Sequence, residues 1–211
     1  MADANSTVLV VDDDSALRDS LGLLLESVDL KAQLFASISE FLKSEAPDGP
    51  TCLVLDVRLP GQSGLDLQRE LAVANRELPI IFITGHGDIP MSVQAMKGGA
   101  IEFLTKPFRD QDLLEAIQLG LSRDRAWREN EEALADLRDR FASLSPRERE
   151  IVIQVARGRL SKQIAFDIGV AEGTVKVHRS RAMQKMKASS LPELGRMVDK
   201  LKLVSDKPQR F

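Results

Sequence analysis

The sequence contains a single cysteine, Cys52, and no apolar segment long enough to cross a membrane. With only one thiol, a disulfide within the chain is impossible. A membrane-spanning helix needs roughly 20 consecutive apolar residues, and the start of the chain has neither the basic nor the apolar region of a signal peptide. These absences predict a protein of the reducing cytoplasm that has no membrane partner.

Charge is distributed unevenly along the 211 residues, although the formal net charge is only −3. Residues 1–121 contain 9 basic and 19 acidic side chains, whereas residues 145–211 contain 15 basic and 7 acidic ones. The segment between them is nearly balanced, with 5 and 6. An acidic front half and a basic rear module predict two domains with different partners, and a polyanion is the candidate partner of the rear one.

Short apolar runs alternate with helical patterns through the front half. Runs of this kind, bounded by turn residues, are typical of buried strands in a parallel sheet. The expected strands are residues 7–11, 31–36, 52–56, 78–84 and 100–105. The expected helices between them are residues 16–28, 38–46, 65–74 and 89–97. This alternation predicts a five-stranded, parallel, doubly wound α/β sheet with right-handed crossovers.

Polar side chains gather at the ends of four of these strands. They are Asp12 and Asp13 after the first strand, Asp56 at the end of the third, Thr84 at the end of the fourth and Lys106 after the fifth. Each has an ordinary explanation when taken alone, since carboxylates cap helices and strand-end Thr or Lys residues satisfy loops or are solvated. Ligands of open α/β sheets, however, bind beyond the carboxyl ends of the strands. The convergence of these groups on one edge therefore indicates a site.

The residue types at this edge suit phosphoryl transfer. A carboxylate such as Asp56 can accept a phosphoryl group as a nucleophile, and the transfer depends on positioning and on neutralisation of charge. Three adjacent carboxylates begin at Asp12, and they repel one another unless a cation neutralises them. We expect Mg²⁺ to be held directly by Asp13 and Asp56 and at least partly through water by Asp12. Lys106 and Thr84 would each hydrogen-bond a phosphoryl oxygen.

Residues 7–120 resemble the receiver domain of two-component signalling proteins. The matching motifs are Val10-Val-Asp-Asp13, Leu55-Asp-Val-Arg-Leu-Pro-Gly61, Ile83-Thr-Gly85 and Leu104-Thr-Lys-Pro-Phe108. The resemblance implies a flavodoxin-like fold, phosphorylation of Asp56 by a sensor histidine kinase, and a need for Mg²⁺ or Mn²⁺. It also implies that the backbone carbonyl of Arg58 completes the metal shell and that the Lys106–Pro107 peptide is cis.

The same resemblance implies a switch that couples Thr84 to Phe103 on the fifth strand, where many family members carry Tyr. Because Phe has no hydroxyl, such a switch would change packing rather than hydrogen bonding. The alternative is that Phe103 is an ordinary core residue. A receiver assists its own Mg²⁺-dependent phosphorylation and dephosphorylation, but it is not otherwise expected to be an enzyme.

From Arg109 to about Phe141, only Gly120 interrupts a helical pattern. Residues 122–132 mix charges of opposite sign, as exposed helices with i, i+4 ion pairs do. We therefore expect the last helix of the first domain to continue as a helical linker over residues 122–143. A coiled-coil dimer is the sharper hypothesis for this segment, and two incomplete heptads are its only support.

Four short helices are expected after the linker. The first begins with Ser145 as N-cap and Pro146 in its first turn, and Glu148 completes a capping box. Ser161 is the expected cap of the second helix. The second, third and fourth helices are expected at residues 162–168, 174–187 and 191–203. A tight turn between the second and the third describes a helix-turn-helix.

The third of these helices has a basic surface without a single carboxylate between residues 174 and 187. Val175, Ala182, Met183 and Met186 can face the core. A basic recognition helix in a DNA major groove explains this composition better than a merely solvated face. The basic residues expected on the surface are Lys176, Arg179, Arg181, Lys185 and Lys187.

Residues 144–203 resemble the DNA-binding domain of LuxR-type regulators. The matching features are Leu144-Ser-Pro-Arg-Glu-Arg-Glu150, Ser161-Lys-Gln-Ile-Ala165, Thr174-Val-Lys-Val-His178 and Lys185-Met186. The resemblance implies that Lys176, Val177 and Ser180 face base edges. It places Thr174, Arg179 and Arg181 near the DNA backbone, and Lys185 belongs to the same basic surface.

Together the two resemblances indicate a response regulator of the NarL/FixJ class. The expected domains are a receiver at 1–121, a helical linker at 122–143 and a helix-turn-helix domain at 144–211. Such a protein would dimerise when phosphorylated, bind promoter DNA and act on RNA polymerase. One alternative is an aspartyl-phosphate hydrolase, although Arg58 stands where many such enzymes carry a second acid. The other is a receiver that signals only through protein contacts.

Overall fold

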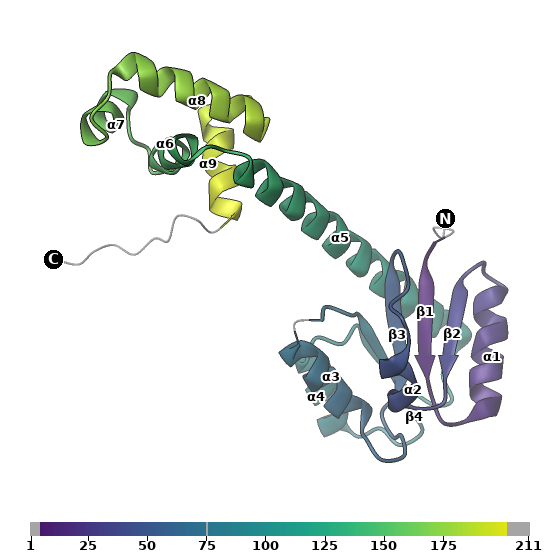
Figure 1. Ribbon diagram of the computed structural model, residues 1–211. Helices are drawn as coiled ribbons and strands as arrows, with labels where there is room; N and C mark the ends of the chain where they lie inside the picture. Colours follow the sequence, from purple (N-terminus) through teal and green to yellow (C-terminus); the bar gives the residue numbers. More distant parts are fainter. Residues whose placement is uncertain (1–4, 75, 202–211) are drawn as a thin grey trace. The chain divides into compact units, whose positions relative to one another are not determined.

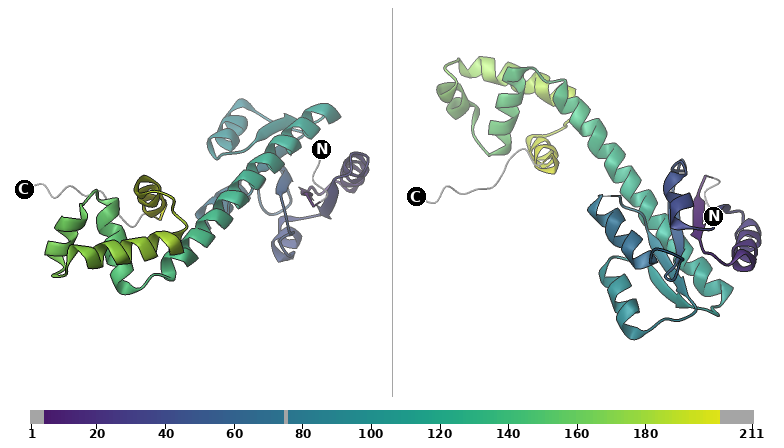
Figure 2. Two further views of the ribbon diagram at one scale, coloured as in Figure 1. Left: turned by 90° about the horizontal axis from the view of Figure 1, so that it is seen from above. Right: turned by 60° about the horizontal axis from the view of Figure 1, so that its bottom comes forward.

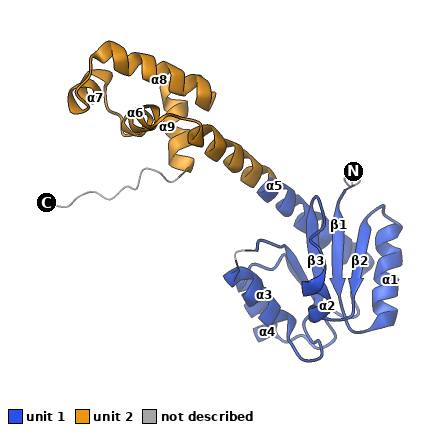
Figure 3. Ribbon diagram, in the orientation of Figure 1, with its two compact units in different colours: residues 1–128 blue, residues 129–211 orange. Residues whose placement is uncertain are grey.

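The structure is a computed structural model that describes residues 5–74 and 76–201. By the density of their internal contacts, residues 1–128 and 129–211 form two compact units (Figure 3).

Unit 1 is built on a parallel sheet with the strand order β2-β1-β3-β4-β5 (Figure 1). The strands are β1 (Thr7–Val11), β2 (Lys31–Phe35), β3 (Thr51–Asp56), β4 (Ile80–Thr84) and β5 (Glu102–Thr105). This result confirms the expected five-stranded, doubly wound sheet. The last two strands begin two residues later than the apolar pattern suggested, because Leu78, Pro79, Ala100 and Ile101 belong to the preceding loops.

Helices cover both faces of this sheet. They are α1 (Ser15–Glu26), α2 (Ile38–Lys43), α3 (Gly64–Val73), α4 (Ile89–Lys97) and the first part of α5 (Asp110–Ala142). Side chains alternate along each strand, so one face packs with α2 and α3 around Leu53 and Phe82. The opposite face packs with α1 and α5 around Val54 and Ile81. Cys52 lies fully buried in this second layer as a free thiol.

Helix α5 runs without a break for 33 residues, as the sequence predicted (Figure 2). Its first apolar stripe, which includes Leu113 and Ile117, is buried against the sheet. The later stripe does not stay free, because Leu137 and Phe141 pack into the core of unit 2. The boundary between the units, at residues 128 and 129, falls inside the expected linker.

Unit 2 contains the last turns of α5 and four further helices. They are α6 (Pro146–Ala156), α7 (Ser161–Asp167), α8 (Glu172–Met186) and α9 (Leu191–Lys200). The capping box of Ser145 and Glu148 is present at the start of α6. Across the part of the chain that the structure describes, no helix is long and apolar enough to cross a membrane.

Two details at the helix-turn-helix differ from the sequence-based expectation. Ser161 is not the cap of α7: the helix begins at Ser161, and Leu160 precedes it as the N-cap residue. The Oε1 atom of Gln163 accepts from the Leu160 amide at 2.9 Å, while the Ser161 hydroxyl accepts from Arg179 at 2.9 Å. Helix α8 begins at Glu172, two residues early, because Gly173 is accommodated inside its first turn.

Candidate functional site

The carboxyl edge of the sheet brings two buried carboxylates to one ammonium group. Asp12 follows β1 and Asp56 ends β3, and these two strands are direct neighbours. Lys106 Nζ lies 2.6 Å from Asp12 Oδ2 and 2.6 Å from Asp56 Oδ2. Asp12 is 0% and Asp56 6% exposed, so both ion pairs are largely shielded from water. The expected convergence of residues from β1, β3 and β5 is therefore present in the structure.

Asp13 joins this cluster from the solvent side. Carboxylate oxygens of Asp12, Asp13 and Asp56 all lie within 4.8 Å of one another, and Asp13 is exposed. The third carboxylate of the run, Asp14, has a different task, since its Oδ1 caps α1 by accepting from the amides of Ala16 at 2.9 Å and Leu17 at 3.2 Å. The helix cap and the acidic site thus use different members of the same tripeptide.

The loop after β3 is folded closely around Asp56. The second oxygen of this carboxylate, Oδ1, accepts from the Arg58 amide at 2.9 Å. Arg58 and Ser63 pair across the loop in an antiparallel bridge, and the Ser63 hydroxyl caps α3. The Arg58 amide therefore orients the Asp56 carboxylate, and its carbonyl belongs to the same loop.

Charge at the edge is shifted by burial and by these contacts. Burial raises the pKa of the Asp12 carboxyl, and the hydrogen bond from Lys106 offsets this only in part. For Lys106, burial alone would lower the pKa of the ammonium, but hydrogen bonds to Asp12 and Asp56 outweigh it and raise the pKa above its usual value. Lys106 contacts two of the three carboxylates, and the Arg18 guanidinium donates to the Asp12 carbonyl oxygen at 2.6 Å. Three carboxylates still outnumber these two cations, and this excess negative charge suits a cation with oxygen ligands.

Thr84 and Phe103 lie on neighbouring strands at the same end of the sheet. Thr84 is 0% exposed, and its hydroxyl accepts from the His86 amide at 3.3 Å. Phe103 is half-buried and its ring lies 6.3 Å from that of Phe82, tilted by 44°. The Lys106 amide donates to the Thr84 carbonyl at 2.8 Å, and the Lys106–Pro107 peptide is cis as expected.

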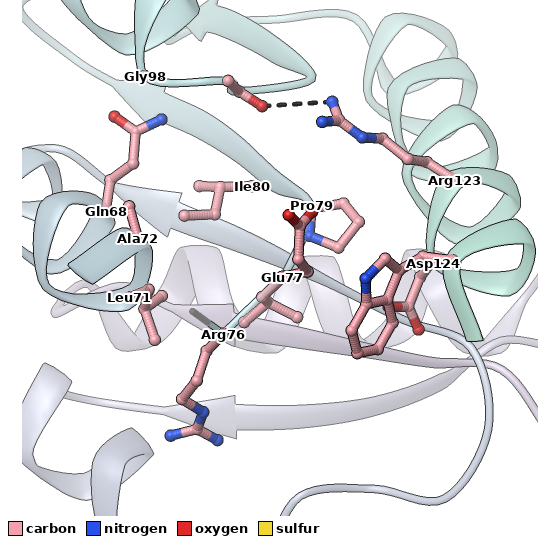
Figure 4. Close-up of a pocket in the computed structure, with 13 residues that line it drawn as sticks. Gln68, Leu71, Ala72, Arg76, Glu77, Pro79, Ile80, Gly98, Arg123 and Asp124 are labelled. Atoms are coloured by element: carbon pink, nitrogen blue, oxygen red, sulfur yellow. Dashed lines mark hydrogen bonds between the residues drawn. The ribbon is translucent and has the colours of Figure 1, made fainter. Parts of the chain in front are cut away.

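A cavity in unit 1 lies away from this edge. It is lined by the start of β4 and by residues of α3 and α5, including Pro79, Ile80 and Trp127 (Figure 4). Asp124 also lines it, but its carboxylate is occupied by the Thr51 amide at 2.8 Å and by Arg128 at 2.6 Å. Because β4 begins here and ends at Thr84, the cavity lies at the opposite end of the strand from the acidic cluster.

In unit 2, one side of α8 is exposed and the other is buried. Val175, Ala182 and Met186 are fully buried, and Met183 is half-buried, as expected for the core-facing positions. The expected base-facing residues lie on the exposed side, and three others of the predicted DNA contacts are exposed as well. These exposed residues are Thr174, Lys176, Val177, Ser180, Arg181 and Lys185.

Two basic residues of α8 also hold the domain together. Lys185 Nζ lies 2.7 Å from Glu148 Oε2, whose side chain is 5% exposed, so it ties α8 to the capping box of α6. Arg179 donates to the Ser161 hydroxyl at 2.9 Å and ties α8 to α7. Among the described residues, Lys176 pairs with Glu172 of its own helix, at 2.8 Å. Unlike Lys185 and Arg179, Lys176 therefore does not tie α8 to another helix of the described part.

Comparison with known proteins connects the two units to one class of protein. Residues 8–118 match the family described as response regulator receiver domain, and residues 142–198 match the family described as bacterial regulatory proteins, luxR family. The chain is a DNA-binding response regulator. The same matches separate it from the aspartyl-phosphate hydrolases considered as an alternative.

Several relatives share the whole organisation of this response regulator. It is 53% identical to Nodulation protein W of Bradyrhizobium diazoefficiens over 95% of this chain and 88% of the relative. It is 46% identical to the response regulator protein TmoT of Ectopseudomonas mendocina over 96% of this chain and 92% of that one. Among solved structures, response regulator StyR matches with a TM-score of 0.81 and 47% identity, covering 93% of this chain and 99% of the other.

Two glycines of the response regulator contribute to the site although the motif analysis assigned them no role there. A Cβ on Gly64 would lie 2.5 Å from the Asp56 carbonyl oxygen, so Gly64 allows α3 to start directly against the phosphate-acceptor candidate. A Cβ on Gly87 would meet the ring of Phe103 at 2.9 Å. Gly64 opens α3 and Gly87 lies in the loop between β4 and α4, and both close approaches depend on the tertiary fold.

Proposed function

We propose that phosphoryl transfer from a sensor histidine kinase to Asp56 controls DNA binding by this response regulator. The observation that carries the proposal is the buried contact of Asp56 with Lys106 at the sheet edge, beside Asp12 and Asp13. Within this arrangement Asp56 has one oxygen oriented by the Arg58 amide and the other bound to an ammonium group. A carboxylate held in this way is positioned as a nucleophile.

In the transfer step, an Asp56 oxygen attacks phosphorus while the bond from phosphorus to the histidine nitrogen breaks. The electron pair of that bond leaves with the imidazole, which takes up a proton. Lys106 then exchanges its contact with Asp56 for one with a phosphoryl oxygen and remains bound to Asp12. The Thr84 hydroxyl donates to another phosphoryl oxygen. Both residues stabilise charge that the transfer brings to a buried edge.

The donor set at this edge fits Mg²⁺ or Mn²⁺, since hard cations favour carboxylate and carbonyl oxygens. Asp12, Asp13 and Asp56 would hold the metal together with the backbone carbonyl of Arg58. When bound, the metal supplies neutralisation of the phosphoryl oxygens. The excess of carboxylates over ammonium groups in the cluster supports this assignment.

Downstream of Asp56, Thr84 and Phe103 form the switch, and α4 carries the response to a dimer. Helix α4 presents an exposed apolar stripe at i, i+4 and i+7, with Ile89 at 80%, Val93 at 45% and Met96 at 45% exposed. Exposed apolar residues on one helix face are typical of an interaction surface. We assign this stripe, with β5 and the start of α5, to the dimer formed on phosphorylation.

In the DNA-binding part, α8 is the recognition helix. Lys176, Val177 and Ser180 would read base edges, while Thr174, Arg179, Arg181 and Lys185 contribute to the phosphate-facing surface. DNA binding through α8 would bring the protein to promoter DNA and to RNA polymerase in the cytoplasm. The functional domains follow as a receiver at 1–121, a linker at 122–143 and a DNA-binding domain at 144–211.

Labelling of the full-length protein with radioactive acetyl phosphate and Mg²⁺ tests the acceptor. The wild-type protein and an Asp66→Ala control, which removes a partly exposed carboxylate of α3 that pairs with Arg69, should incorporate label equally. Asp56→Ala should incorporate none. Persistent label on Asp56→Ala would show that another residue is the acceptor.

A further inference from the structure

The loop between β4 and α4 is pressed against the switch residues at Gly87. A methyl group at this position would lie 2.9 Å from Phe103 Cε1, 3.1 Å from Thr84 Cγ2 and 3.1 Å from Thr105 Cγ2. Carbon atoms in favourable contact are about 3.5–4.0 Å apart. Only glycine therefore lets the loop approach the ring this closely.

The methyl groups of Thr84 and Thr105 stand on strands whose backbones cannot move aside easily, whereas the half-buried Phe103 ring can turn. Thr84 and Thr105 are paired residues at the ends of adjacent strands, so their backbone positions are fixed by the sheet. The Phe103 ring rests against the buried Phe82 in the core layer shared with α2 and α3. An added methyl group must therefore displace the loop, turn the ring, or do both.

The loop also leads directly into α4. Asp88 follows Gly87 and is the N-cap of α4, where its Oδ1 accepts from the Met91 amide at 2.8 Å. On the other side, the His86 amide donates to Thr84. Three consecutive residues therefore contact three parts of the proposed switch. His86 contacts the Thr84 hydroxyl, Gly87 lies against the Phe103 ring, and Asp88 caps the first turn of α4.

We propose that Gly87 is the positioning residue of the switch: it holds the β4–α4 loop closed on Phe103 while Lys106 contacts Asp56 directly. This inference rests on the proposed function, which assigns Thr84 and Phe103 to the response and α4 to the dimer. A side chain at position 87 forces the loop away from the ring. It thereby displaces α4 as phosphorylation would, but without a phosphoryl group. Since the exposed stripe of α4 begins at Ile89, the same displacement raises the dimer fraction.

Gly85 provides a matched control in the same loop. A Cβ at Gly85 has no heavy atom within 4 Å, and neither Gly85 nor Gly87 has a φ in the left-handed region. Alanine at either position is therefore compatible with the backbone conformation, and the two substitutions differ in the close contacts with Phe103, Thr84 and Thr105 that only position 87 makes.

The test uses the full-length chain labelled with 4-fluorophenylalanine, with the Phe103 fluorine resonance identified by its loss in Phe103→Leu. Acetyl phosphate with Mg²⁺ should move this resonance in the wild-type protein. Gly87→Ala should move it in the same direction without a phosphoryl donor and should raise the dimer fraction, measured by sedimentation, at least about threefold. Gly85→Ala should leave both at the wild-type values.

The Phe103→Leu background separates the contact from a general loss of stability. Leucine removes the ring edge that the methyl group meets, so Gly87→Ala should change the dimer fraction much less in Phe103→Leu than in the wild-type background. An unmoved resonance in Gly87→Ala, or an equal effect in both backgrounds, overturns the inference. Failure of the wild-type protein to accept label from acetyl phosphate would instead contradict the proposed function. The two failures can be told apart, because the response of the Phe103 ring to Gly87→Ala is measured without a phosphoryl donor.

Discussion

At the residue scale, the acidic site is held together by Lys106, whose ammonium group lies 2.6 Å from both Asp12 and Asp56. Its pKa is raised by these hydrogen bonds against the effect of burial, so the group stays protonated at neutral pH. A partly buried ammonium between two carboxylates would compete with a metal ion for the same oxygens. Lys106 would therefore influence both the charge balance and the metal affinity of the site.

Removal of this competitor should strengthen metal binding. Lys106→Met removes the ammonium group that contacts Asp12 and Asp56, and we expect roughly tenfold tighter Mg²⁺ binding, about 1.4 kcal/mol, because a full charge is removed next to the ligands. Calorimetric titration of the full-length protein with Mg²⁺ measures this. Lys97→Met, on an exposed position of α4, is the matched control. Weaker Mg²⁺ binding by Lys106→Met would show that Lys106 organises the ligands instead of competing with the metal.

The exposed basic residues of α8 give a second residue-scale prediction. Lys176 pairs with Glu172 on the surface, so Lys176→Ala should leave stability nearly unchanged and weaken DNA binding by about 1–3 kcal/mol. Fluorescence anisotropy with selected DNA fragments at several salt concentrations measures the loss. Lys200→Ala, at the exposed end of α9, serves as the control for lost charge alone. Equal effects of the two substitutions would contradict a recognition role for Lys176.

At the element scale, α6 and α8 are joined through Glu148. Its carboxylate closes the capping box by accepting from the Ser145 amide at 2.8 Å, and it also accepts from Lys185 at 2.7 Å. The hydrogen bond from Lys185, followed by that from Ser145, lowers the pKa of Glu148 from 4.5 to about 2. One buried carboxylate thus secures both the first turn of α6 and the end of the recognition helix.

Glu148→Gln should destabilise unit 2 by ~1–2 kcal/mol, since it weakens a cap and an ion pair. The carboxylate has a lower pKa in the folded than in the unfolded chain, so its stabilisation is complete above about pH 4.5 and is lost as the pH falls toward 2. The difference between wild type and Glu148→Gln in urea unfolding should therefore shrink over this range. Glu150→Gln, whose carboxylate is exposed at the surface, is the control. A difference that stays constant from pH 6 to pH 3 would contradict the assignment.

Most elements could be predicted from the sequence because their signals are local. The apolar runs of β1 and β3 end where they were expected, and the Ser145 capping box is a short-range motif. The cap of α7 could not be predicted in the same way. Ser161 has the right residue type, but its hydroxyl is engaged by Arg179 from α8, a contact between residues 18 positions apart.

The acidic site was also largely predictable, because parallel strands must bring their carboxyl ends to one edge. The other features of the site depend on tertiary contacts. The bridging position of Lys106, the closeness of Gly64 to the Asp56 carbonyl and that of Gly87 to Phe103 depend on loops whose paths the sequence pattern does not specify. The second role of Lys185 was hidden for the same reason, since its partner Glu148 lies 37 residues away.

At the scale of the whole molecule, the acidic and basic halves of the sequence correspond to the receiver and the DNA-binding domain. The acidic front half contains the carboxylate cluster of the receiver, and the basic rear module contains α8. Helix α5 contributes residues to the cores of both units, Ile117 to the first and Leu137 to the second. Packing in unit 2 accounts for Leu137 and Phe141 of the later apolar stripe, and the coiled-coil dimer of this segment stays a hypothesis.

The central claim is that a phosphoryl group on Asp56 controls DNA binding. Its most direct test is the affinity of the full-length protein for fragments selected from genomic DNA, measured with and without acetyl phosphate and Mg²⁺. We expect phosphorylation to tighten binding at least about tenfold in the wild-type protein and not at all in Asp56→Ala. Equal affinity of the wild-type protein in both conditions, or an equal gain in Asp56→Ala, would contradict the account.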